Sequence, residues 1–345
     1  KPLDFGPEND ERSALRLRSG ALVQIAVGTF NLNNLFSRFD FRADVSTASA
    51  STVKVEERTS FSFDDPSGFK LRTYLGKLVR GKLAAERGLI AARIKRMDLD
   101  VLAVQEAEDI DTLRQFVRDD LGGLYRHIVL IEGNDPRLID IGLLSKLPIG
   151  GVTSWQHVPD PLSPGQPVFS RDLLQVEILS PSRRQRLFTV FNNHLKSHYV
   201  PFNAPDPDAE RQRANGLRQR QSEVAAAIIA AQMRPNSRFA VVGDMNDPPD
   251  SPFLEPLAAA PKLNLAFGLS QPQETRPGPG DPPPPSRAWT ERFKPTGKPP
   301  VYTLMDQVWL SPALAAKQTG AFIERRTKVS GDGSDHDPAW VTLDL

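Results

Sequence analysis

Eight short runs of apolar, β-forming residues, separated by three longer helical patterns, constrain the fold of this chain more than any other feature. The runs are rich in branched aliphatic residues and are bounded by polar or turn-forming residues, which indicates strands. In the helical patterns apolar residues recur at intervals of three and four, as on one face of an α-helix. The predicted strands are residues 23–30, 99–104, 139–144, 173–178, 187–192, 239–242, 305–310 and 339–343, and the predicted helices are residues 71–97, 109–121 and 208–233.

The order of these elements argues against a regular parallel α/β array. Strands and helices alternate irregularly, and residues 171–192 are predicted to form a hairpin that turns at Ser180-Pro181-Ser182. Because hairpins join antiparallel strands while helices separate other strands, we expect mixed sheets. The chain is therefore predicted to fold as a layered α/β sandwich.

We expect a single domain over residues 23–345, preceded by an N-terminal extension at residues 1–22. Two stretches within the domain are predicted to be long loops. The first, at about residues 37–67, is polar and rich in serine and threonine, and the second, at residues 271–300, holds much of the proline of the chain. Loops of this length in compact domains are either functional or disordered, and the sequence leaves both open.

Composition excludes several classes of protein. The chain has no cysteine, which rules out disulfide frameworks, thiolate metal sites and cysteine nucleophiles. Lysine and arginine number 43 against 42 for aspartate and glutamate, a net charge of +1, so any surface that binds a polyanion must be local. No apolar stretch approaches the roughly 20 residues of a membrane span. We expect a soluble protein whose compartment stays open, including secretion after removal of a signal that these residues do not contain.

Polar and acidic residues gather at the ends of six predicted strands. Side chains at strand ends leave the sheet and converge at one rim, where α/β folds bind ligands. One such residue alone is an ordinary turn residue, but six segments together predict a site. Carboxylate and amide oxygens suit Mg²⁺ or Mn²⁺, and paired histidine and aspartate suit acid–base chemistry. The segments are Asn31-Leu32-Asn33-Asn34, Gln105-Glu106, Asn192-Asn193-His194, Asp244-Met245-Asn246, Asp306 and Ser334-Asp335-His336-Asp337.

These segments, in this order, resemble the motif series of the endonuclease/exonuclease/phosphatase superfamily, and most of all its bacterial nuclease-like branch. The resemblance extends from about residue 23 to the end of the chain. It implies a four-layer α/β sandwich, in which two mixed, mainly antiparallel β-sheets pack face to face and are flanked by helices. The matching motifs are FNLNNLF at residues 30–36, VQE at 104–106, NHLKS at 193–197, GDMNDPPDSP at 243–252, MD at 305–306 and SDHDP at 334–338.

The resemblance also implies a divalent-metal site. Glu106 would be the principal carboxylate ligand, with Asn33 and Asp335 near the ion. Mg²⁺ is the expected cofactor, with Mn²⁺ or Ca²⁺ as alternatives. Abasic-site endonucleases have an aspartate where this chain has Asn33, whereas the deoxyribonuclease branch has a neutral residue there, so this position resembles the deoxyribonuclease branch.

Catalytic and phosphate-binding roles are implied in the same way. Asp244 and Asn246 would align the attacking water and the phosphate oxygens. His336, paired with Asp306, would contact the scissile phosphate or act as general base, and His194 would act from the opposite side as general acid or phosphoryl stabiliser. A guanidinium fork pairs well with phosphate, which adds one arginine to the candidates for substrate binding. The expected phosphate-binding residues are Asn31, Asn193 and Arg171.

The implied chemistry is in-line attack of water on a phosphoester bond. We expect a nuclease that cleaves DNA or RNA, with nucleic acid as the substrate partner; no protein partner is inferred. A phosphoesterase of a small molecule or a lipid head group is the alternative, and the near-neutral net charge favours it. A binding module without activity is disfavoured by the complete motif set.

For two groups of residues the sequence leaves two roles open. Aromatic residues near the loops either stack on bases or hold the proline-rich loop in place, and basic residues of the third predicted helix form either a solvated face or a contact for a nucleic-acid backbone. Lys82 and Arg87, in the first predicted helix, are interpreted as part of a solvated face. The aromatic residues are Phe202, Trp289 and Tyr302, and the basic residues are Arg211, Arg213, Arg218 and Arg220.

Overall fold

The computed structural model describes residues 23–36, 82–201, 204–259, 263–265, 273–274, 278–279 and 288–345. The N-terminal extension at 1–22 and the loop expected at about 37–67 lie outside the described residues, as do residues 71–81 of the first predicted helix. Within the described part, no helix combines the length and the apolar character needed to span a membrane.

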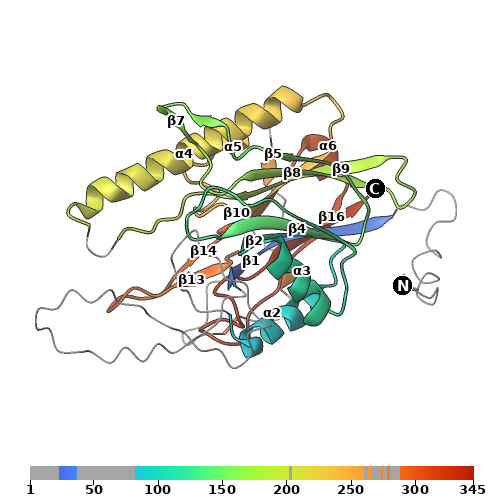
Figure 1. The fold of residues 1–345 in the computed structure, drawn as a ribbon, viewed down its shortest axis with the longest axis horizontal. Helices are drawn as coiled ribbons and strands as arrows, with labels where there is room; N and C mark the ends of the chain where they lie inside the picture. The colour runs from blue at the N-terminus through green and yellow to red at the C-terminus, as the bar shows by residue number, and fades with distance from the viewer. Residues whose placement is uncertain are drawn as a thin grey trace, which may run out of the picture.

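Two large β-sheets form the centre of the molecule (Figure 1). The strand pairs β1–β2, β9–β10 and β12–β16 are parallel, and the remaining pairs of both sheets are antiparallel. The first sheet has the order β12 (Gln273–Glu274), β16 (Gln318–Ile323), β17 (Ala339–Asp344), β1 (Gln24–Leu35), β2 (Val101–Ala107), β4 (Asp140–Ser145) and β3 (His127–Leu130). The second has the order β11 (Asn264–Leu265), β15 (Asp306–Leu310), β10 (Phe239–Asp244), β9 (Arg186–His194), β8 (Leu173–Leu179) and β5 (Ile149–Ser154).

Helices cover the outer faces of both sheets, and two short hairpins stand apart from them (Figure 1). Asp109 and Asp206 cap the N-termini of two helices by accepting hydrogen bonds from backbone amides of the first turn, as aspartate often does. The helices are α2 (Ala84–Met97) and α3 (Ile110–Asp119) on the first sheet, α4 (Pro207–Gln232) and α5 (Glu255–Ala259) on the second, and α6 (Pro312–Ala315) after β15. The hairpins are β6 (Pro159–Asp160) with β7 (Ser163–Pro167), and β13 (Glu291–Phe293) with β14 (Val301–Thr303).

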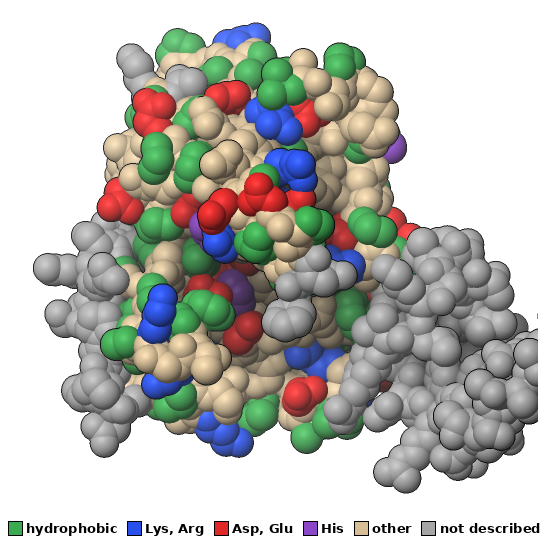
Figure 2. Space-filling model, turned by 90° about the vertical axis from the view of Figure 1, so that its left-hand side faces the viewer, with side chains coloured by type: hydrophobic (Ala, Val, Ile, Leu, Met, Phe, Trp, Pro, Cys, Tyr) green, Lys and Arg blue, Asp and Glu red, His purple; other side chains and the backbone are tan. Residues whose placement is uncertain are grey.

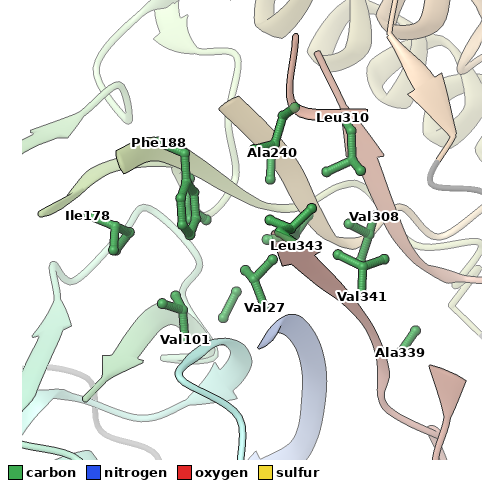
Figure 3. Packing of buried hydrophobic residues seen from close by; sticks show 14 of the residues in the cluster. Val27, Val101, Ile178, Phe188, Ala240, Val308, Leu310, Ala339, Val341 and Leu343 are labelled. Atoms are coloured by element: carbon green, nitrogen blue, oxygen red, sulfur yellow. The ribbon is translucent and has the colours of Figure 1, made fainter. Parts of the chain in front are cut away.

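Three apolar clusters hold the layers together, because successive strand residues point to opposite faces. In β2, Val101 and Ala103 face the second sheet, whereas Leu102 and Val104 pack under α2 and α3. Strands buried on both faces read as continuous apolar runs, which is why they stand out in the sequence. Figure 3 shows the cluster between the sheets, with side chains such as Val27 of β1 and Phe188 of β9 pointing into one layer.

The predicted four-layer sandwich is confirmed, and each of the eight predicted strands is present with ends shifted by a few residues. The hairpin through residues 180–182 is also present, because β8 pairs antiparallel with β9.

The helices at 109–121 and 208–233 correspond to α3 and α4. Nine further strands in the described part of the chain were not predicted. Strands β5 and β16 are interrupted by glycine and threonine, and the others have five residues or fewer: β3, β6, β7, β11, β12, β13 and β14. The predicted loop at 271–300 contains β12 and β13.

Gly243 allows the parallel strands β9 and β10 to meet closely beside Asp244. Its backbone has a φ of +137°, and a Cβ atom there would lie 1.9 Å from the carbonyl oxygen of Asn193. We expect Gly243→Ala to lower the free energy of unfolding by about 2–4 kcal/mol, through steric clash and an unfavourable φ. Urea denaturation followed by circular dichroism measures the change.

Gly216, in the middle of α4, is the matched control. A Cβ atom there meets nothing closer than Nη1 of Arg220 at 3.5 Å, so Gly216→Ala should stabilise the protein by about 0.5–1 kcal/mol. Equal stabilities of the two variants would contradict the role given to Gly243.

Candidate active site

The carboxyl ends of two parallel strand pairs, one in each sheet, meet at one edge of the sandwich. In the second sheet Asp244 pairs in register with His194 of β9 and Asp306 of β15. Across the sandwich, Asn31 of β1 donates from Nδ2 to Oδ2 of Asp244 at 3.0 Å. Ser334 donates to the carbonyl oxygen of Asn31 at 2.7 Å and so adds the loop before β17. The segments that the sequence predicts to converge therefore share one rim, and Figure 2 shows a hollow on the molecular surface in which acidic and histidine side chains gather.

Backbone irregularities turn the acidic and amide side chains into the rim. The pairing of β1 with β2 changes register between Asn31 and Leu35, and the pairing of β2 with β4 changes register on either side of Glu106. Glu106 has a φ of +60°, and positive values also occur at Asn33, Asn34 and Asn246. Non-glycine residues seldom adopt this conformation, and bulges of this kind re-aim side chains next to functional sites.

The residues expected to bind metal are joined by hydrogen bonds. Glu106 accepts from the backbone amide of Asn34 at 3.0 Å through Oε2, and Asn33 donates from Nδ2 to Oδ1 of Asp335 at 2.7 Å. Asn34 also donates to Oδ1 of Asn33 at 3.1 Å, which closes the chain of contacts from Glu106 to Asp335. Beside Asn33 and Asp335 lies a cavity of about 490 Å³, which Lys82 and Lys328 also line.

These residues fit a hard cation that keeps much of its water. In the described part of the chain no three histidine, cysteine, aspartate or glutamate side chains lie close enough together to hold a metal ion. Mg²⁺ needs no such cage, because it commonly binds through one or two carboxylates, water and substrate phosphate. Two carboxylates, Glu106 and Asp335, with the amide oxygen of Asn33 match that donor set.

The two predicted histidines flank a buried carboxylate. Nδ1 of His336 lies 2.7 Å from Oδ2 of Asp306, and its Nε2 lies 3.8 Å from Oδ2 of Asp244. Nε2 of His194 lies 3.6 Å from the same oxygen of Asp244 and 3.9 Å from Oε1 of Glu106. Asp244 is further held by the backbone amide of Asn246, which donates to Oδ1 at 2.9 Å.

The surroundings set the two histidines to opposite charge states. Burial lowers the pKa of His194 well below its usual 6.5, and the nearby cations, Arg171 first, lower it further. Burial also opposes charge on His336, but the carboxylates of Asp306 and Asp244 outweigh it and raise its pKa well above 6.5. Burial raises the pKa of Asp244 to about 7. A neutral His194 therefore faces a cationic His336 across Asp244.

The three residues expected to bind phosphate differ in their environment. Both polar atoms of the Asn31 side chain already have partners: Nδ2 donates to Asp244, and Oδ1 accepts from the backbone amide of Asn33. Both polar atoms of the Asn193 side chain are fully buried and find no hydrogen-bond partner among the described residues, so the hydrogen-bonding capacity of this amide is unused. The guanidinium of Arg171 is not available to bind phosphate directly, because the residue is only 2% exposed. Its Nε pairs with Asp135 at 3.0 Å, and its Nη1 donates to the carbonyl oxygen of Leu195. The guanidinium acts on the site through its field rather than by contact.

A buried cluster of three arginines stands behind the rim. Arg93, Arg325 and Arg326 lie 2.9, 3.4 and 3.0 Å from the carboxylate of Asp337, the residue after His336. Arg93 also donates to the carbonyl oxygen of His336, and Arg326 donates to that of Asp335. The backbone at Asp335 and His336 is thereby fixed to the interior.

Other residues near the rim differ from the sequence predictions or carry no sequence signal. Lys82 precedes α2, is half-buried and donates from Nζ to the carbonyl oxygen of Gly333 at 2.7 Å, so it is not part of a solvated helix face. Arg87 pairs with Asp120. Glu291, which forms an isolated antiparallel bridge with His336, carries no motif that could have identified it.

The aromatic and α4 alternatives are partly resolved by the structure. Trp289 and Tyr302 are buried against each other, with ring centroids 4.9 Å apart, so they hold the chain in place; Phe202 lies outside the described residues. In α4, the exposed Arg211 and Arg213 pair with acidic residues of the same helix. The other two do not form a solvated face: Arg218 is buried against Asp247, and Arg220 pairs with Asp160.

A family model described as the endonuclease/exonuclease/phosphatase family matches residues 28–336. The chain belongs to this family. The match includes every predicted site residue, from Asn31 to His336. No curated protein sequence matches the chain.

Solved structures of family members share the fold at low sequence identity. The chain is similar to an AP endonuclease from Archaeoglobus fulgidus, with 14% identity, a TM-score of 0.54, and coverage of 93% of this chain and 100% of that one. It is also similar to TDP2 from Caenorhabditis elegans, with 17% identity, a TM-score of 0.54 and coverage of 98% and 80%. A mannosyl-6-phosphatase from Bacteroides thetaiotaomicron has 12% identity, a TM-score of 0.51 and coverage of 92% and 98%. These likenesses establish the fold.

The opposite charge states of His194 and His336 can be tested by nuclear magnetic resonance, because the chain has only five histidines. We expect His336 to titrate well above 6.5 and His194 well below it. Since the folded-state pKa of His336 is raised, its pairing with Asp306 stabilises the fold fully below about pH 6.5, and this contribution is lost as pH rises through the raised value. Asp306→Asn should lower the pKa of His336, because the carboxylate that most favours its charged form is lost.

His127 is the internal control for that titration. It lies at the far end of β3, paired with Ser145 away from the rim, so Asp306→Asn should leave its pKa unchanged. An unchanged pKa of His336 in Asp306→Asn would show that Asp306 does not set its charge.

Proposed function

We propose that this chain is a divalent-metal-dependent phosphodiester hydrolase that cleaves nucleic acid by in-line attack of water. The observation that carries the proposal is the placement of one buried carboxylate, Asp244, within 4 Å of two histidines of opposite charge state, one of which also lies beside Glu106. Membership of a family that hydrolyses phosphoester bonds supports the reaction class.

Glu106, Asp335 and the amide oxygen of Asn33 would hold the cation, Mg²⁺ first and Mn²⁺ or Ca²⁺ as alternatives. When bound, a divalent cation offsets negative charge that develops on phosphate oxygens. Lys82 stands near both carboxylates, where its ammonium group partly balances their charge. The hydrogen bonds that join Asn34 and Asn33 to Glu106 and Asp335 keep these donors oriented.

Asp244 would act as the general base. Its pKa of about 7 makes it an effective proton acceptor near neutral pH, and its two oxygens are oriented by Asn31 and by the amide of Asn246. The water proton would pass to a carboxylate oxygen of Asp244 as the water oxygen bonds to phosphorus. The P–O bond opposite the water would break at the same time, and the leaving oxygen would take its proton from solvent water. Cationic His336, kept charged by Asp306, would stabilise the negative phosphate oxygens, and the unpaired amide of Asn193 would donate a hydrogen bond to them.

A phosphoesterase of small molecules is the second candidate. The cavity of about 490 Å³ beside Asn33 and Asp335 has room for a compact phosphorylated ligand, and Lys82 and Lys328 on its wall would attract one. The net charge of +1 also gives no general attraction to a polyanion.

A metal-resolved activity screen tests the proposed function. The purified chain is incubated with plasmid DNA, single-stranded RNA or bis(p-nitrophenyl) phosphate, in Mg²⁺, Mn²⁺, Ca²⁺ or a chelator. We expect cleavage of nucleic acid that the chelator abolishes, and a loss of at least about 100-fold in kcat/KM in Glu106→Gln and His336→Ala.

Glu177→Gln is the matched control for Glu106→Gln. Glu177 lies on β8 and pairs with Arg186 on the neighbouring strand, so this variant should keep wild-type activity. Hydrolysis of the small ester beside intact nucleic acids would favour the second candidate, and full activity in Glu106→Gln would refute the site.

The dependence of kcat/KM on pH tests the roles of Asp244 and His336. Activity should rise as Asp244 loses its proton, at or below its pKa of about 7, because a bound cation can only lower that value. Activity should fall at higher pH, where His336 loses its raised-pKa proton. Asp306→Asn should move the falling limb to lower pH; a falling limb that stays in place would contradict the assignment.

A further inference from the structure

A two-stranded hairpin stands at the rim of the candidate active site, outside both large sheets. Strands β13 and β14 pair with the register Glu291 to Thr303, Arg292 to Tyr302 and Phe293 to Val301. Figure 1 shows the hairpin reaching out from the edge of the sandwich. The roles proposed for the catalytic residues make no use of it.

The root of this hairpin is fixed to the catalytic centre. Thr290 accepts hydrogen bonds through Oγ1 from the backbone amide of Asp306 at 2.9 Å, and its carbonyl oxygen accepts from the amide of Asp337 at 2.8 Å. Glu291 forms its bridge with His336. Buried Trp289 packs against Tyr302 and lies under the guanidinium of Arg325, 3.9 Å from the ring centroid. The hairpin therefore has a defined position relative to His336.

One face of the hairpin is directed along the catalytic rim. Successive residues of a strand point to opposite faces, so Glu291 and Phe293 share a face, as do their partners Thr303 and Val301. The carboxyl group of Glu291, on that face, interacts electrostatically with His336, Asp335 and Asp306. Phe293 lies two residues farther out, about 7 Å along the strand, on the same side.

The outer part of that face is apolar and its surroundings are cationic. Phe293 is 58% exposed and Val301 is 49% exposed, and they are direct cross-strand neighbours. The turn that joins the strands carries the exposed Lys294 and Lys298, and Glu291 at the root is the sole acidic residue in residues 291–303. A rigid aromatic ring in water, flanked by ammonium groups, is a suitable surface for a nucleobase between two phosphates.

We propose that Phe293, supported by Val301, is a stacking platform for an unpaired nucleotide next to the scissile phosphate, and that Lys294 and Lys298 contact the phosphates beyond it. The inference rests on the proposed function and narrows its substrate to polynucleotides with a single-stranded segment at the cleavage site. In a duplex both faces of a base are already stacked, so the ring gains a partner only where the strand is unpaired. Phe293 lies two residues beyond Glu291, which bridges to His336, so the stacked base would lie roughly one or two nucleotides from the cleaved bond.

Steady-state kinetics on three substrates test this proposal: a single-stranded oligonucleotide, the duplex of the same sequence, and bis(p-nitrophenyl) phosphate. Loss of base–aromatic stacking, roughly 1–3 kcal/mol, predicts that Phe293→Ala raises KM for the single strand by roughly 5- to 150-fold. We expect kcat on the single strand and all constants for the small ester to stay within about twofold of wild type. Phe293→Tyr, which keeps the ring, should restore KM.

Two further variants sharpen the result. Lys294→Gln combined with Lys298→Gln should lower the slope of log binding against log salt by about 1.4 for the single strand, at about 0.7 for each lost phosphate contact. Leu162→Ala removes an apolar side chain that is 74% exposed in the β6–β7 hairpin and should change nothing.

Other outcomes overturn the inference in distinguishable ways. Equal losses on all three substrates in Phe293→Ala would mean that Phe293 is structural, and no loss on the single strand would mean that it does not bind substrate. Sedimentation with phosphatidylcholine and phosphatidylserine vesicles that depends on Phe293, without an effect on the oligonucleotide, would assign the face to a lipid surface. Wild-type protein that cleaves the oligonucleotides with a KM that does not respond to Phe293→Ala overturns this inference alone, whereas wild-type protein that cleaves neither oligonucleotide overturns the proposed nuclease function with it.

Discussion

Asp244 joins the two sheets at the point where the apolar layer between them ends. It belongs to the second sheet, yet one of its oxygens is held by Asn31 of the first sheet, and just inside this contact Gln105 donates to Asn192 across the sandwich at 2.8 Å. A buried carboxylate or amide without partners costs several kcal/mol, so the two sheets are favoured to pack in the one register that satisfies these groups. That same register places Glu106 of the first sheet beside His194 of the second.

Buried arginines below the rim balance the negative charge of Asp337, the residue after His336. Asp337 is shared among three buried arginines, two of which also lie near the ring of Trp289. A buried ion pair is weak evidence for stability, because desolvation of the charges offsets their attraction. Here, however, the guanidinium groups also bind backbone carbonyl groups, such as those of Thr290 and Asp335. The cluster thereby connects the loop before β17 to the root of the β13–β14 hairpin, so His336, a candidate catalytic residue, and the proposed substrate platform share one rigid support.

Much of the candidate site was predictable, because its residues sit in short motifs at strand ends, where fold geometry forces convergence. The motifs alone were enough to place Glu106, Asp244 and His336 in one site. Arg171 was misjudged because its partner, Asp135, is far away in sequence and its burial depends on tertiary packing. Phe293 was missed because a three-residue strand in a proline-rich stretch carries no periodic signal.

The sequence by itself determined the layered α/β fold and the order of the motifs, because strands buried on both faces must be continuously apolar and polar residues at their ends must leave the sheet. It could not determine how charge is distributed among those residues. The opposite pKa shifts of His194 and His336 arise from which cations and carboxylates lie within a few ångströms of each ring. Those distances, like the exposure of Phe293 beside the rim, exist only once distant segments have packed together, since electrostatic and stacking energies depend on separation in space and not along the chain.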